Sequence, residues 1–125
     1  MKKVLYIDDD IDQLELYKMA FALYAPDVEF YAEKDPFMSI ARICSLKPDL
    51  VLLDLVMAEG MGGLEVAKMI RENYEVGSVM IVAFTNSMLT NIIAPLNKLG
   101  ITEIWEKIKM NPKMMVMKVK NLLDK

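Results

Sequence analysis

The stretch "VLYIDDDIDQLEL", residues 4–16, runs from four apolar residues directly into three consecutive aspartates. A short apolar run without polar alternation is typical of a strand that is covered on both faces. Asp8, Asp9 and Asp10 would then stand together at the end of that strand. Neighbouring carboxylates repel one another, and burying one is costly unless it is paired, protonated or bound to a metal. So much negative charge at a buried strand end therefore points to a functional site.

The same pattern, a short apolar run followed by a longer amphipathic segment, recurs along the chain. The apolar runs are Val4–Ile7, Val28–Ala32, Leu50–Leu53, Val79–Ala83 and Ile101–Trp105. Strict alternation of strands and helices predicts an α/β fold, with a five-stranded parallel sheet flanked by five helices on its two faces. No linker, low-complexity tract or repeat divides the sequence, so we expect a single domain over residues 1–125.

Helix starts and buried helix faces can be assigned from local signals. Asp35-Pro36 and Asn111-Pro112 each combine an N-cap residue with Pro at the first helical position. Pro95 is expected to kink or shorten the fourth helix. The apolar positions expected on the buried faces are Leu14, Tyr17, Phe21 and Tyr24; Phe37, Ile40, Ala41 and Cys44; Leu64, Ala67, Met69 and Ile70; Met88, Ile92 and Leu96; and Met115, Val119, Leu122 and Leu123.

Composition narrows the class of protein. The 125 residues are 54% hydrophobic and 26% charged, with a net charge of −3 and no His. The absence of a basic stripe argues against nucleic acid as a direct ligand. The single Cys44 excludes an intrachain disulfide and, without His, a Cys/His zinc site. The start lacks a signal-peptide pattern, and polar residues and Pro95 interrupt the long uncharged run 76–97. We expect a soluble, cytoplasmic protein without membrane insertion.

Polar residues at the strand ends form the candidate site. Asp8 and Asp9 follow the first run, Asp54 the third, Thr85 the fourth and Lys107 the fifth. In an open α/β sheet these ends meet at the edge where ligands bind. Clustered carboxylates suit Mg²⁺, or Mn²⁺. A carboxylate beside such an ion can attack a phosphoryl group, and an ammonium and a hydroxyl can stabilise its oxygens.

Each of these residues also has an ordinary structural explanation. Asp10 and Asp12 are expected to be mainly N-cap and helix-dipole residues. Taken alone, Asp54 could be a turn residue, Thr85 a helix cap and Lys107 a solvated surface charge. Their occurrence together, on successive strand ends, is what favours a functional site.

In this order, the residues resemble the receiver domain of two-component response regulators over essentially the whole chain. The elements that match are the acidic pair Asp8-Asp9, the "DLVLLDLVM" stretch around Asp54, Thr85 and Lys107. The resemblance implies a flavodoxin-like, doubly wound sheet with strand order 2-1-3-4-5. It also implies a signalling phosphoprotein, with no enzymatic activity beyond self-phosphorylation and self-dephosphorylation.

The resemblance further implies a role for each matching residue. Asp54 corresponds to the aspartate that a histidine kinase or phosphotransfer protein phosphorylates. Asp9 would ligate Mg²⁺ (or Mn²⁺) directly and Asp8 through water, and Asp54 and the carbonyl of Val56 would be further ligands.

The remaining matching residues would bind the phosphoryl group. Thr85 and Lys107 would contact its oxygens, together with the backbone N–H of Asn86. Phosphorylation would switch a surface made by the fourth helix, fifth strand and fifth helix, on which Met114 and Met117 are expected to be exposed. This surface would bind a downstream protein, and the chain would be a monomer or weak dimer.

Three departures from the family pattern are visible. Residues 57–63 lack the Pro and Asp of the usual loop and include one extra residue. Lys107 precedes Ile108 where the family has Pro, and because a non-proline cis bond is costly we expect a trans bond. Ile104 occupies the usual position of the switch aromatic, and alternation points Trp105 to the opposite face. Aromatic rotation is therefore not the expected switch.

Further hypotheses concern reactivity and function. Val56 and Ser87 would flank the approach of hydrolytic water, and an apolar Val56 would slow self-dephosphorylation. One alternative is a receiver-like binding module that works without phosphorylation. Another is a haloacid-dehalogenase-like phosphatase, with Asp8 as nucleophile and Asp10 as acid/base, although such an enzyme would leave Asp54 without a role.

Overall fold

Strands and helices alternate along the chain in the computed structural model, which describes residues 1–57, 61–86 and 90–124. The strands are β1 (Lys3–Ile7), β2 (Glu29–Glu33), β3 (Leu50–Leu53), β4 (Met80–Thr85) and β5 (Glu103–Glu106). They form one parallel sheet in the order β2-β1-β3-β4-β5. The predicted α/β class and strand order are therefore confirmed.

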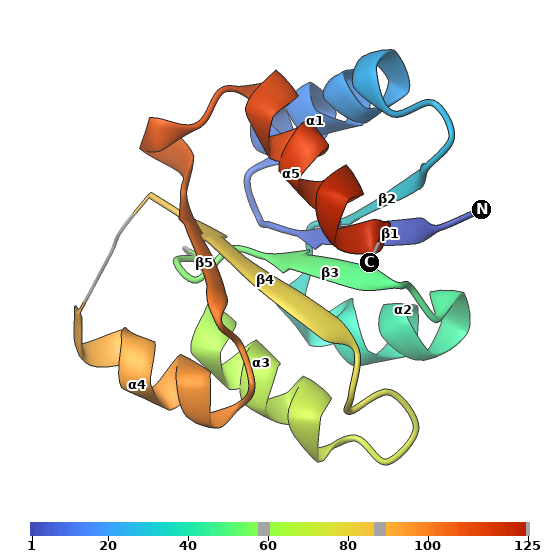
Figure 1. The fold of residues 1–125 in the computed structure, drawn as a ribbon. Helices are drawn as coiled ribbons and strands as arrows, with labels where there is room; N and C mark the ends of the chain where they lie inside the picture. The colour runs from blue at the N-terminus through green and yellow to red at the C-terminus, as the bar shows by residue number, and fades with distance from the viewer. Residues whose placement is uncertain (58–60, 87–89, 125) are drawn as a thin grey trace.

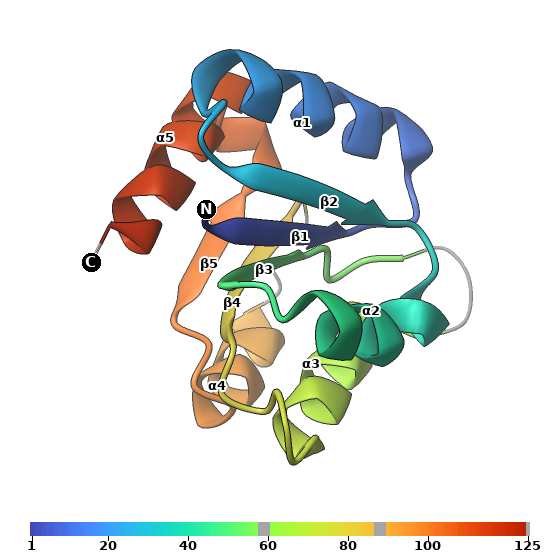
Figure 2. The same cartoon turned by 90° about the vertical axis from the view of Figure 1, so that its right-hand side faces the viewer.

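Helices cover both faces of this sheet. They are α1 (Ile11–Tyr24), α2 (Ser39–Leu46), α3 (Gly63–Glu72), α4 (Thr90–Lys98) and α5 (Pro112–Leu123), with short 3-10 turns η1 (Pro36–Met38) and η2 (Lys107–Lys109). Figure 1 shows α1 and α5 on one side of the sheet and α2, α3 and α4 on the other, and Figure 2 shows the same layers from the side. The arrangement is doubly wound.

Each face of the sheet has its own apolar core. Tyr6, Phe84 and Trp105 point toward α1 and α5, whereas Leu5 and Ile104 belong to the core under α2, α3 and α4. Because neighbouring residues of a strand point to opposite faces, a central strand needs an apolar residue at every position. This explains why the runs at β1 and β3 show no polar alternation. It also confirms that Trp105 and Ile104 lie on opposite faces.

The helix starts follow the predicted caps. The Asp10 carboxylate accepts hydrogen bonds from the amides two and three residues further on, at the start of α1. Asn111 caps α5 in the same way, with Pro at the first helical position. Asp35 accepts from the amide of Phe37, as an N-cap should, but the segment it caps is η1. Local cap chemistry thus located the starts of α1 and α5.

The predicted buried face of the second helix is wrong at two of its four positions, whereas Ile40 and Cys44 pack against the core as expected. Phe37 is 62% exposed and Ala41 is exposed, while Ser39 and Ile43 are buried. The 3-10 turn over residues 36–38 explains the difference, because it has three residues per turn and shifts the phase of the helix that follows.

The third and fourth helices differ in smaller ways. In α3, Val66 is buried where Met69 was expected, and Met69 is 39% exposed because it lies beyond the arc of the buried face. In α4, Leu96 is fully buried, and the helix continues through Pro95 to its end. The expected position Met88 lies outside the described residues. Among the described helices, none combines the length and the apolar character needed to cross a membrane.

Candidate functional site

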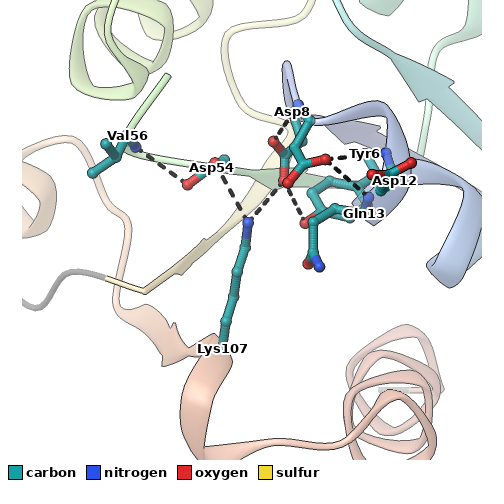
Figure 3. Close-up of polar contacts among 8 residues, drawn as sticks. Tyr6, Asp8, Asp12, Gln13, Asp54, Val56 and Lys107 are labelled. Carbon is teal, nitrogen blue, oxygen red and sulfur yellow. Dashed lines mark hydrogen bonds and ion pairs between the residues drawn. The ribbon is translucent and has the colours of Figure 1, made fainter. Parts of the chain in front are cut away.

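The register of the central strands brings two aspartates side by side. Ile7 pairs with Leu53 across β1 and β3, so the residues that follow them leave the sheet together. The backbone N–H of Asp54 donates to the carbonyl of Ile7 at 3.0 Å, which extends the ladder by one step. Asp8 and Asp54 therefore lie at the same carboxyl edge (Figure 3).

Three carboxylates converge at this edge. Asp8, Asp9 and Asp54 each present an oxygen within 4.8 Å of the others. Asp8 is fully buried and Asp54 is 6% exposed. Hard oxygen donors at this spacing fit a divalent cation such as Mg²⁺, which takes one or two carboxylates and completes its shell with water or phosphoryl oxygens.

Lys107 faces this acidic group from the turn that directly follows β5. Its Nζ lies 2.8 Å from Asp8 Oδ2 and 3.4 Å from Asp54 Oδ2, and its side chain is only 8% exposed. The ammonium also lies over the rings of Tyr6 and Phe84, at 5.9 and 5.5 Å from their centroids. The interpretation of Lys107 as a solvated surface charge is therefore wrong.

The pairing of β5 with β4 brings Lys107 to the carboxyl edge of the sheet. Thr85 pairs with Glu106, so the residue after each strand end is brought to the site. Lys107 begins the short turn η2, whose second residue Ile108 is 82% exposed. No cis peptide bond occurs in the part of the chain that the structure describes, so the Lys107–Ile108 bond is trans, as expected.

A small pocket of about 310 Å³ lies beside the acidic cluster at this edge of the sheet. Its lining consists of Asp9, Asp10, Gln13, Asp54, Val56, Asn86 and Lys107. Thr85 is fully buried as the last residue of β4, immediately before Asn86. The N–H of Val56 donates to Asp54 Oδ1 at 3.2 Å, which fixes the loop beside the acceptor oxygen. Ser87 and residues 58–60 of the altered loop lie outside the described residues.

The site perturbs the ionisation of its acids. Burial, and then the negative charge of Asp8, raises the pKa of Asp54 from 3.8 to about 6, against the opposing effects of Lys107 and the Val56 N–H. Burial, again followed by the charge of Asp8, raises the pKa of the Tyr6 phenol. Tyr6 therefore keeps its proton and donates to Asp8 Oδ2 at 2.8 Å. The acidic cluster is strained electrostatically, a condition that a bound cation would relieve.

The sequence analysis missed two residues that shape this site. Tyr6 could have been found as the one polar side chain in "VLYI", two residues before Asp8 and so on the same face of the strand. Gly63 could have been suspected from the Gly-Gly pair that opens α3. A Cβ atom at Gly63 would lie 2.3 Å from the carbonyl oxygen of Asp54, so only glycine allows α3 to approach the strand end so closely.

Known proteins with similar sequences indicate the family to which this chain is related. A family model described as the response regulator receiver domain matches residues 4–119. The DNA-binding response regulator MtrA of Mycobacterium tuberculosis is 31% identical over 87 residues, 70% of this chain and 37% of MtrA. The transcriptional regulatory protein LiaR of Bacillus subtilis is 33% identical over 101 residues, 80% of this chain and 46% of LiaR. The chain thus spans less than half the length of these relatives.

Solved structures show the same fold. The signal receiver domain of a DNA-binding response regulator from Colwellia psychrerythraea superposes with a TM-score of 0.86, covers 100% of both chains and is 22% identical. At that identity the similarity concerns the fold alone, and it agrees with the strand order found here.

Proposed function

The chain belongs to the response regulator receiver domain family, and on that premise we propose that Asp54 is its phosphoacceptor. The donor is the phosphohistidine of a histidine kinase or a phosphotransfer protein. One observation carries the proposal: Lys107 Nζ lies 2.8 Å from Asp8 and 3.4 Å from Asp54, although the three residues are far apart in the sequence. An ammonium facing clustered carboxylates matches the charge needs of phosphoryl transfer.

The reaction is a displacement at phosphorus. A carboxylate oxygen of Asp54 forms a bond to phosphorus while the phosphorus–nitrogen bond of the donor breaks, and the electron pair returns to the donor's imidazole. The product is an acyl phosphate on Asp54. Lys107, placed between the two acids, neutralises charge on the transferred oxygens.

The acidic cluster would hold the metal ion. Asp9 and Asp54 would ligate Mg²⁺ (or Mn²⁺) directly, Asp8 through water, and Val56 through its carbonyl. When bound, the cation supplies positive charge that relieves carboxylate repulsion and stabilises phosphoryl oxygens. The Thr85 hydroxyl and the Asn86 N–H complete the set of groups proposed to contact the phosphoryl group.

The output of the switch is proposed to be a protein-binding surface formed by α4, β5 and α5. Met114 and Met117 of α5 are 48% and 42% exposed, and flexible methionines suit adaptable contacts. We propose that residues 1–125 act as one cytoplasmic receiver domain, a monomer or weak dimer without direct nucleic-acid binding. The name of the relative MtrA includes DNA binding, but the matched region covers only 37% of MtrA, so this activity is not proposed for residues 1–125.

Two alternatives give different experimental results. In a haloacid-dehalogenase-like phosphatase Asp10 would act as acid/base, but its carboxylate caps α1 and accepts two backbone hydrogen bonds there. A module that works without phosphorylation would share the fold and leave Asp54 unmodified. Its motivation is the altered loop after Asp54, of which residues 58–60 lie outside the described part.

The test is phosphorylation by a small donor. The protein is incubated with acetyl phosphate and Mg²⁺ and analysed by mass spectrometry, with Asp54→Asn as the control. We expect one phosphoryl group on Asp54, no incorporation in the variant and no incorporation in EDTA. Absence of reaction would support the inert module, and steady turnover of p-nitrophenyl phosphate would support the phosphatase.

A further inference from the structure

The carboxylate of Asp8 is held by three donors. Its Oδ2 accepts from the Tyr6 hydroxyl at 2.8 Å and from Lys107 Nζ at 2.8 Å. Its Oδ1 accepts from the backbone N–H of Asp10 at 3.0 Å. Asp8 is fully buried, so these contacts take the place of water. One oxygen therefore has two donors, one neutral and one charged.

The proposed reaction needs Lys107 to change partners. Its Nζ is closer to Asp8 than to Asp54, by 2.8 against 3.4 Å. A phosphoryl group on Asp54 attracts the ammonium away from Asp8. A buried carboxylate oxygen that loses a charged donor costs free energy, and this cost would oppose the transfer.

We propose that Tyr6 is a positioning residue that keeps Oδ2 of Asp8 hydrogen-bonded while Lys107 moves to the phosphoryl group. This inference rests on the proposed function of Asp54. The hydroxyl is the second donor on Oδ2, so Asp8 keeps its orientation and a partner after the ammonium leaves. Tyr6 thereby lowers the cost of the phosphorylated state without touching the phosphoryl group.

The surroundings of Tyr6 suit this task. Tyr6 and Asp8 are two apart at the end of β1, so they point to the same face of the sheet. The Tyr6 ring is fully buried and packs edge-on against Tyr17 and Phe84, at centroid distances of 5.7 and 6.0 Å, and against Phe30. This packing fixes the ring, so the hydroxyl stays aimed at Asp8.

Tyr6→Phe removes the hydroxyl and leaves the ring in place. Tyr17→Phe is the matched control, because Tyr17 belongs to the same aromatic cluster and the structure shows no hydrogen bond between its hydroxyl and Asp8. Two affinities are measured on the full chain: Mg²⁺ alone by calorimetry, and beryllofluoride, a phosphoryl mimic, at saturating Mg²⁺. Binding of Mg²⁺ alone leaves Lys107 beside Asp8, whereas beryllofluoride draws the Lys107 ammonium toward Asp54.

We expect a split between the two affinities. Tyr6→Phe should raise the beryllofluoride concentration for half-saturation about tenfold, the effect of one lost hydrogen bond to a buried charge. Its affinity for Mg²⁺ alone should change by less than about threefold, since Lys107 still serves Asp8. Tyr17→Phe should change neither affinity.

The outcomes separate this inference from the function on which it rests. If the wild-type protein binds no beryllofluoride and takes no phosphoryl group, the proposed function fails. If the wild type responds and Tyr6→Phe behaves like it, or weakens both affinities equally, the positioning role is wrong. If Tyr6→Phe fails to fold, the inference can still be tested on the wild-type protein. In the wild type, the ¹³Cζ chemical shift of Tyr6 should remain that of a hydrogen-bonded phenol in the beryllofluoride complex, and a free phenol there would contradict the inference.

Discussion

Asp54 meets two opposing requirements at the level of a single residue. If Asp54 is the phosphoacceptor, as proposed, burial would protect its acyl phosphate from water, yet burial also disfavours the ionised carboxylate that would attack phosphorus. The raised pKa of Asp54, about 6, expresses this conflict, and Asp8 adds to it. Lys107 and the Val56 N–H act in the opposite direction and keep Asp54 ionised at neutral pH. The buried charge of Asp54 beside Asp8 should therefore lower the free energy of unfolding of the metal-free protein.

Asp54→Asn should stabilise the metal-free protein at neutral pH. The pKa of Asp54 is higher in the folded protein than its ordinary 3.8, so the folded state binds more protons between these values. Stability therefore falls as the pH rises through that window, and the full cost is present above it. We expect a gain of about 1–3 kcal/mol near pH 7.5 that shrinks toward pH 4. Urea unfolding in EDTA at both pH values measures it. A variant less stable than the wild type near pH 7.5 would refute the prediction.

Val56→Asn should shorten the lifetime of the phosphorylated protein. Val56 lines the pocket beside Asp54 and is 54% exposed, and its side chain offers no hydrogen bond to an attacking water. A polar group there should speed dephosphorylation about two- to tenfold, the range of one ordinary hydrogen bond. Decay of the acyl phosphate after removal of the donor gives the rate. Val56→Leu, which adds no polar group, is the control. An unchanged or slower rate of dephosphorylation in Val56→Asn would contradict the prediction.

At the level of elements, a single arginine ties three segments together at the edge of the sheet opposite the site. Arg71, near the end of α3, donates to the carbonyls of Gly77 and Val79, at 2.9 and 2.5 Å. It also donates to the carbonyl of Leu99, just after α4, at 2.6 Å. Burial lowers the pKa of the guanidinium. Arg71 therefore joins the end of α3, the start of β4 and the end of α4.

Arg71→Met should destabilise this corner by about 2–4 kcal/mol, because three carbonyls lose a charged donor. Lys68→Met is the matched control, since Lys68 is an exposed cation of the same helix. Urea unfolding gives the free energy of each variant. Hydrogen exchange should show the largest loss of protection at the start of β4 and the end of α4. Equal stability of the two variants would mean that the three hydrogen bonds contribute little.

At the level of the whole molecule, the fold gathers charge at one edge. The parallel strands all end on the same side, so residues far apart in sequence meet there: Lys107 and Asp8 are separated by 99 positions. An apolar core packs against each face of the sheet, beneath the two helix layers that Figure 1 shows. Global stability and the site are thereby linked, and a ligand of the site should stabilise the entire fold.

Mg²⁺ should raise the melting temperature of the wild-type protein. At about ten times its dissociation constant, a ligand that binds only the folded state adds about 1.4 kcal/mol, or roughly 5 °C for a domain of this size. Asp9→Asn should abolish the effect. Asp10→Asn should preserve it, because Asp10 caps α1 and asparagine caps equally well. Thermal unfolding at constant ionic strength measures all three proteins, and an equal Mg²⁺ response in Asp9→Asn would contradict the assignment.

Much of this architecture could be predicted from local patterns. The runs at β1 and β3, the caps Asp10 and Asn111 and the α/β class were anticipated correctly from these patterns, whereas the strand order was implied only by the resemblance to receiver domains. The buried face of α2 was anticipated only in part, because a 3-10 turn changed its phase and exposed Phe37. The apolar run predicts Tyr6 only as a buried strand position and not as a hydrogen-bond donor to Asp8. The roles of the site residues remain predictions.

The sequence by itself determined which residues stand at the strand ends, since periodicity and caps depend on neighbouring residues. Only the tertiary structure decided how those side chains meet. It pairs Asp8 with both Tyr6 and Lys107, and it makes Gly63 indispensable beside Asp54. The physical reason is that such contacts depend on rotations and separations of a few ångströms, which the packing of two cores fixes and no local pattern encodes.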